Sequence, residues 1–137
     1  TVTASGGGGT LPSRTIVSGS TANIAANETG NFNITGFKSY ALMKVGLSTA
    51  GWIRLYTNNT SRANDASRSI GEDPTPGDGV IAEVITTGIS TQQNISPFTI
   101  GGNMDDVVDT TIYVSITNLS GTTQSITANL TILQLEQ

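Results

Sequence analysis

The chain of 137 residues contains no cysteine and no histidine. Without cysteine it can form neither disulfide bonds nor thiolate metal sites. Without histidine it lacks the commonest general base, so Ser-His, Cys-His and histidine-based zinc sites are excluded as well. The two absences together predict a protein that is not an enzyme and that needs no cofactor.

Charge is also scarce, since charged residues make up 12% of the chain and the formal net charge is −4. An acidic chain with 6 Lys and Arg residues cannot build the dense basic stripe that neutralises a phosphate backbone, which argues against a nucleic-acid partner. The longest apolar runs, such as residues 41–43 and 80–82, are far shorter than the ~18 residues that span a bilayer. We therefore expect no membrane partner either.

Aromatic residues make up 5% of the chain and hydrophobic residues 36%, which predicts a thin core. The length suits one domain. Ser, Thr, Asn and Gly are abundant instead, so the surface should consist mainly of hydroxyl and amide groups. A thin core also suggests that contacts between subunits supply part of the stability.

The N-terminal segment, residues 1–12, contains Gly6, Gly7, Gly8 and Gly9 and has almost no side chain able to anchor a core. The glycine run is not a phosphate-binding loop, because no strand precedes it and no Gly-Lys-Ser/Thr follows. We predict a flexible arm over residues 1–12 and a single domain over residues 13–137, with Gly6–Gly9 as candidate contacts to a partner.

After the arm, segments rich in β-branched and aromatic residues alternate with clusters of Gly, Asn, Pro and Ser. The fold class predicted is all-β: an antiparallel β-sandwich or jelly roll of about 7–9 short strands with one long loop over residues 58–79. The candidate strands are residues 13–18, 21–25, 30–35, 38–47, 52–57, 80–86, 92–99, 110–117 and 124–135.

Alternation is clearest in residues 111–117, where Ile112, Val114 and Ile116 share one face and hydroxyl residues share the other. Residues 126–132 keep the same alternation, but Leu133 and Leu135 fall on the opposite face, which a bulge or burial on both faces would explain. Two short loops, residues 48–51 and 118–123, predict hairpins between the strands that they connect.

The long loop, residues 58–79, is rich in turn residues and charges, and loops of this length usually carry a function or an interface. Its part 61–70 is compatible with a helical turn capped by Ser61, in which Asp65 and Arg68 would meet across three residues.

One strand offers two interpretations: Trp52, Arg54 and Tyr56 share a face, while Ile53 and Leu55 share the other. If the first face is exposed, it forms a recognition patch with the arginine between two aromatic rings. If it is buried, Arg54 should pair with an acid such as Glu83. The candidate binding residues around this patch are Trp52, Arg54, Tyr56, Arg62, Arg68, Glu72 and Asp73.

A second acidic group, Asp105, Asp106 and Asp109, offers oxygen ligands at close spacing, as Ca²⁺ prefers. It lacks the glycine and the closing glutamate of an EF-hand loop, which makes it a weak calcium candidate. The favoured interpretation places Asp105 and Asp106 in an exposed turn, with Asp109 ending or capping the next strand. No metal site is therefore assigned.

Several segments together resemble a family of virion proteins of tailed phages, in particular phages of cyanobacteria and marine bacteria. They are residues 37–42, 51–57, 61–62, 65–68, 73–77, 79–86, 117–121 and 126–135. The resemblance leaves residues 1–30 outside, and it implies a place in the virion rather than a reaction.

On this basis the expected function is that of a capsid decoration, or cement, protein on the capsid surface. Its expected partners are the major capsid protein or other virion proteins, together with further copies of itself, a trimer being favoured. The alternative is a tail-fibre, spike or knob module that binds a host-surface glycan.

Overall fold

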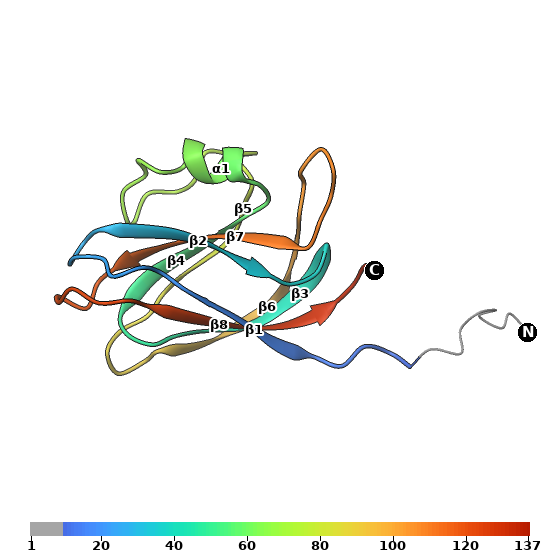
Figure 1. The fold of residues 1–137 in the computed structure, drawn as a ribbon, viewed down its shortest axis with the longest axis horizontal. Coiled ribbons are helices and arrows are strands. Elements are labelled where there is room, and N and C mark those ends of the chain that lie inside the picture. Colours follow the sequence, from blue (N-terminus) through green and yellow to red (C-terminus); the bar gives the residue numbers. More distant parts are fainter. Residues whose placement is uncertain (1–9) are drawn as a thin grey trace, which may run out of the picture.

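A computed structural model of the protein describes residues 10–137. These residues form two layers of strands with one short helix on the outside of one layer (Figure 1). The elements in chain order are β1 (Thr15–Ser20), β2 (Thr29–Thr35), β3 (Ser39–Leu47), β4 (Gly51–Tyr56), α1 (Asn59–Asn64), β5 (Val80–Ile85), β6 (Gln92–Gly102), β7 (Thr111–Asn118) and β8 (Thr127–Gln134).

The strands make two four-stranded sheets, with the orders β1-β8-β3-β6 and β2-β7-β4-β5. We call them the β1 sheet and the β2 sheet. Every strand pair is antiparallel. The predicted antiparallel β-sandwich is therefore confirmed.

The pairing is nested, because β1 pairs with β8, β2 with β7, β3 with β6 and β4 with β5. The chain thus runs as one long two-stranded ribbon folded back on itself. The ribbon wraps so that β3 also pairs with β8 and β4 with β7, which closes the two sheets. This arrangement is a jelly roll, and residues 57–79 form the tip of the ribbon.

Both predicted hairpins are wrong. The loop after β3 leads to β4 in the other sheet, and the connection from β7 to β8 also crosses between sheets. The reason is that both edges of each strand are already occupied: β3 lies between β8 and β6, and β7 lies between β2 and β4. A short loop can carry the chain across the sandwich as well as reverse it within a sheet.

The predicted strand at residues 21–25 is also wrong. This segment crosses from β1 in one sheet to β2 in the other, so it cannot keep one continuous partner. It makes a single isolated bridge, Ile24 with Gln124. Thr21 is buried, and its Oγ1 accepts a hydrogen bond of 3.0 Å from the Ile126 amide.

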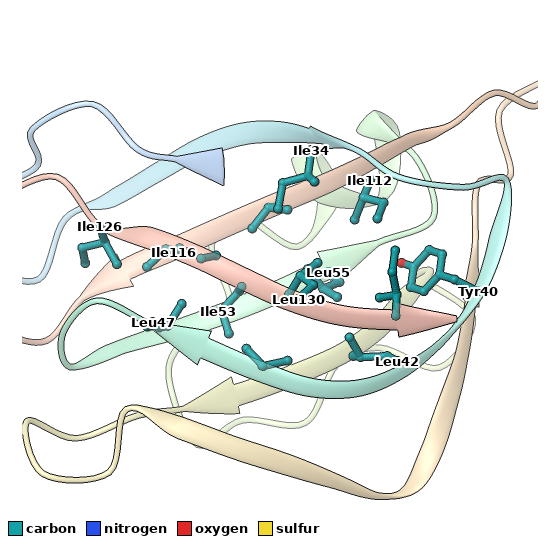
Figure 2. Close-up of a cluster of buried hydrophobic side chains, with 14 residues drawn as sticks. Ile34, Tyr40, Leu42, Leu47, Ile53, Leu55, Ile112, Ile116, Ile126 and Leu130 are labelled. Carbon is teal, nitrogen blue, oxygen red and sulfur yellow. The ribbon is translucent and has the colours of Figure 1, made fainter. Parts of the chain in front are cut away.

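Alternating side chains from the two sheets meet in the core (Figure 2). Ile112, Val114 and Ile116 of β7 all lie in it, which confirms their predicted face. Ile126, just before β8, and Ala128, Leu130 and Ile132 within it also lie in the core. Leu133 and Leu135 lie outside the core cluster and are partly exposed. The bulge lies in the neighbouring β3, between Leu42 and Lys44, rather than in β8.

Of the predicted arm, residues 1–9, which include Gly6, Gly7, Gly8 and Gly9, lie outside the described residues. Residues 10–14 belong to no strand, and the first strand begins at Thr15.

Candidate functional site

The strand β4 is buried on both faces, from Gly51 to Tyr56. Ile53 and Leu55 point into the core between the sheets. Trp52, Arg54 and Tyr56 lie on the opposite, outer face and are equally buried. Burial of this face supports the second of the two interpretations of the strand, and the open recognition patch is wrong.

Residues 57–79, which we call the lid, contact the outer side of β4 (Figure 1). The lid begins with a helical turn, but it is shorter and earlier than the one predicted over residues 61–70. α1 spans Asn59–Asn64, and its cap is Asn58 rather than Ser61. The Asn58 side chain accepts a hydrogen bond of 2.8 Å from the Ser61 amide. Asn58 is a good cap because its side-chain oxygen Oδ1 accepts from a backbone amide that has no partner within the first helical turn.

Asp65 holds the lid to the strand. It is buried, it accepts a hydrogen bond of 2.7 Å from the Tyr56 hydroxyl, and it pairs with Arg68 at 2.8 Å, as the three-residue spacing predicted. Burial acts to raise the pKa of Asp65, but the hydrogen bonds from Arg68 and Tyr56 outweigh it and hold the pKa below its ordinary value. The Asp65 hydrogen bond raises the pKa of Arg68.

Arg68 also forms an ion pair with Glu83, the acid that was expected to pair with Arg54. Glu83 stands directly opposite Arg54 in the β4–β5 register, yet its Oε2 lies 3.0 Å from Arg68 Nη1. Glu83 Oε1 accepts a hydrogen bond of 3.2 Å from the Trp52 indole. The expected Arg54–Glu83 pair is therefore wrong, because Arg68 is held beside Glu83 by Asp65 and binds both carboxylates.

Arg54 has no carboxylate partner within residues 10–137. Its Nη2 donates to Thr117 Oγ1 at 2.8 Å, and its guanidinium carbon lies 3.8 Å from the centroid of the Trp52 ring. The Arg54 Nε is buried and meets no acceptor in this part of the chain. Burial lowers the pKa of Arg54.

Arg62 ties α1 to the β2 sheet. Its Nη1 donates to the carbonyl oxygens of Phe32 and Val114 at 2.9 and 3.2 Å, and its guanidinium lies 5.2 Å from the Tyr113 ring. Burial lowers the pKa of Arg62. These contacts give Arg62, predicted as a ligand contact, a structural role in fixing the lid.

Glu72 and Asp73 lie at the exposed end of the lid. Glu72 accepts a hydrogen bond of 2.9 Å from the Ser69 amide, and its backbone carbonyl accepts one of 2.7 Å from Arg68. Both residues line a shallow polar pocket together with Asp78. They are exposed, whereas Trp52 and Tyr56, with which they were grouped, are buried.

The aspartates after β6 are organised around Asn103, which is buried. Its Nδ2 donates to Asp105 Oδ2 and Asp109 Oδ1, each at 3.0 Å. Asp105 also accepts a hydrogen bond of 2.7 Å from the Tyr113 hydroxyl, which raises the pKa of Tyr113. Asp106 is exposed. Among the described residues no group of three or more acidic side chains is placed to hold a metal ion.

The outer face of the β1 sheet has no lid within the described chain (Figure 1). Its four strands contain one charged residue, Lys44. Leu133, Ala41 and Ile100 lie side by side across three strands. With Phe98 and Ile16 they form what we call the apolar face, in which Phe98 is 54% exposed and Ile16 and Ile100 are each 65% exposed.

Sequence reasoning missed this face, because Ile16 and Phe98 were assigned only to strands and the strand predicted over residues 92–99 stopped before Ile100, whereas β6 runs on to Gly102. The signal was present in β6, where Phe98 and Ile100 alternate with Pro97, Thr99 and Gly101.

No protein-family model matches the chain, and no curated protein matches its sequence. The only helix in residues 10–137 has six residues, so no helix there could cross a membrane.

Proposed function

We propose that the chain is a structural protein of a tailed-phage virion, a decoration protein that binds and stabilises the major capsid shell. The sequence resemblance points to the virion. The observation that carries the binding role is the apolar face, where Ile16, Phe98 and Ile100 expose more than half of their surface.

The composition of the apolar face is that of an interface. The centres of protein interfaces are depleted in charge and enriched in aromatic side chains. The four strands of the β1 sheet contain one charged residue, and Phe98 lies at its edge strand. Contiguous exposed apolar surface on a small protein usually marks a binding site.

The proposed partner is the major capsid protein, which would have to present an apolar and weakly charged surface to this face. A trimer of decoration subunits on the capsid surface is the favoured assembly, because a chain with a thin core gains stability from neighbours. The proposal assigns no reaction to the chain, in keeping with the lack of His and Cys.

The tail-fibre alternative loses most of its expected contacts. Trp52 and Tyr56 are 3% and 1% exposed and cannot form a sugar-stacking platform, and Arg62 is engaged with backbone carbonyls. No specific observation favours a position in the tail.

The test is binding of the purified chain to capsids assembled without it, measured by co-sedimentation. The double variant Phe98→Ser, Ile100→Ser should abolish binding, while Ile89→Ser, Val107→Ser, which changes two even more exposed apolar residues in loops, should leave it unchanged. Wild-type binding by the first variant would refute the role of the face. Self-association of the chain without capsid binding would assign the face to subunit contacts instead.

A further inference from the structure

A second surface feature is a pocket on the outer side of the β2 sheet, at the edge of the lid. Its volume is about 250 Å³. Four separate segments meet there: the turn before β2, the strand β4, the lid and the end of β7. The polar residues that line it are Asn27, Thr29, Trp52, Arg54, Arg68 and Thr117.

Arg54 is the unusual member of this pocket. It is 2% exposed, and one of its nitrogens, Nη2, meets an acceptor among the described residues. A buried guanidinium normally pairs with a carboxylate, because burying an unpaired charge is strongly unfavourable. Stacking on Trp52 offsets only part of that cost.

The two nearby carboxylates do not fill this role. Asp65 and Glu83 both form their ion pairs with Arg68, which leaves Arg54 as the unpaired cation of the cluster. The pairing is unequal by geometry, since Arg68 is anchored by Asp65 and by the Glu72 carbonyl. Arg54 therefore retains donor capacity on the wall of a pocket whose lining also includes the exposed residues Asn27 and Thr29.

We propose that this pocket binds a small carboxylate, with Arg54 as the charge partner of the carboxylate group. Guanidinium groups bind carboxylates in a planar, two-point geometry. The pocket is smaller than the roughly 300–1,000 Å³ of sites for drug-sized ligands, so it suits a single small acid or one acidic sugar residue. Asn27 and Thr29 supply an amide and a hydroxyl group for the rest of such a ligand, while Thr117 Oγ1 already accepts from Arg54 and lies 2.7 Å from Thr29 Oγ1.

The pocket is independent of the surface proposed to bind the capsid, because it lies on the opposite sheet from the apolar face. Capsid binding and carboxylate binding can therefore be tested separately, because the Phe98 and Ile100 variant changes no residue of the pocket. Either result can be obtained without the other.

Trp52 provides the assay, because it is the only tryptophan in the chain and lies 3.8 Å from the Arg54 guanidinium carbon. Intrinsic fluorescence of the full chain is titrated with methyl β-glucuronide, with acetate and with neutral methyl β-glucoside. We expect a saturable change with glucuronide and none with glucoside. A change with acetate as well identifies the free carboxylate as sufficient, whereas a change with glucuronide alone identifies an acidic sugar.

The matched variants are Arg54→Met and Arg14→Met, since each removes one positive charge and Arg14 is exposed outside the pocket. Arg54→Met should weaken glucuronide binding at least about tenfold, or about 1.4 kcal/mol, and Arg14→Met should not. Replacing an unpaired buried charge by an apolar side chain is compatible with folding. The proposal is overturned if wild type responds to neither acid, or if glucoside binds as well as glucuronide.

Discussion

The two outer faces of the sandwich differ in how they meet solvent. The β2 sheet has Trp52, Arg54 and Tyr56 on its outer side and covers them with the lid, using one buried aspartate and two arginines. The β1 sheet leaves Phe98 and Ile100 open. On the β2 sheet a polar network buries Trp52 and Tyr56, although Ile85 beside Trp52 and Ile70 in the lid remain 49% and 47% exposed. The difference teaches that the lid covers the centre of one outer face, while the apolar side chains of the other have no such cover.

The largest expected effect comes from breaking the lid at Asp65. Asp65→Ala leaves the Tyr56 hydroxyl without its acceptor and Arg68 without its closest ion-pair partner, so it should lower the free energy of unfolding by about 3–5 kcal/mol. Urea denaturation measures this change in the free energy of unfolding. Asp73→Ala, an exposed acid in the same lid, is the control and should change stability by less than about 0.5 kcal/mol.

Acid should weaken the same contact in the unmodified protein. Because the pKa of Asp65 is lower in the folded state, its contribution is fully present above the ordinary value of 3.8 and is lost as the pH falls through the folded pKa. The unfolding free energy is measured from pH 6 down to pH 2. Asp65→Asn should show a shallower acid dependence, and identical slopes would remove Asp65 as its source.

A smaller effect, of opposite sign, is expected in the core that both sheets share. The Tyr40 hydroxyl is buried and has no hydrogen-bond partner among the described residues, and burial raises its pKa. Tyr40→Phe removes this unsatisfied group and should stabilise the protein by about 1 kcal/mol. Thermal unfolding tests it, and a clear loss of stability would mean that the hydroxyl is satisfied.

The smallest effect is expected on the open face. Ile100→Thr keeps a β-branched side chain at a position that is 65% exposed, so the free energy of unfolding should change by less than about 0.5 kcal/mol. A loss of more than about 2 kcal/mol would show that Ile100 supports the fold of the isolated chain. The contrast between the two faces would then no longer hold.

Much of the strand layout could be predicted, because residues such as Ile112, Val114 and Ile116 reveal a half-buried strand through their period of two. The connections could not, because the short loops after β3 and β7 suit either a reversal or a crossing. Which one occurs depends on strand partners far away in the sequence. Local pattern does not contain that information.

The site was predictable to a similar depth. The three-residue spacing of Asp65 and Arg68 predicted their ion pair, although the two residues lie in the turn that follows α1 rather than within a helix. The Arg68 amide donates to the Asp65 carbonyl at 3.1 Å in this turn. The partner of Glu83 was not predictable, since two arginines compete for it and the fold of the lid decides between them. The apolar face was predictable only in part: the alternation of Phe98 and Ile100 is visible in the sequence, but the sequence does not show which sheet faces lack a cover.

The nested strand pairing has a consequence for the order of folding. Contacts between β4 and β5 close the shortest loop, whereas partners in β1 and β8 such as Ser20 and Thr127 are 107 positions apart. Closing long loops costs entropy before any contact offsets it. We therefore expect the strand pairs to form in order from the β4–β5 pair toward the chain ends, so that β1 pairs last. Folding of the whole domain should be slow.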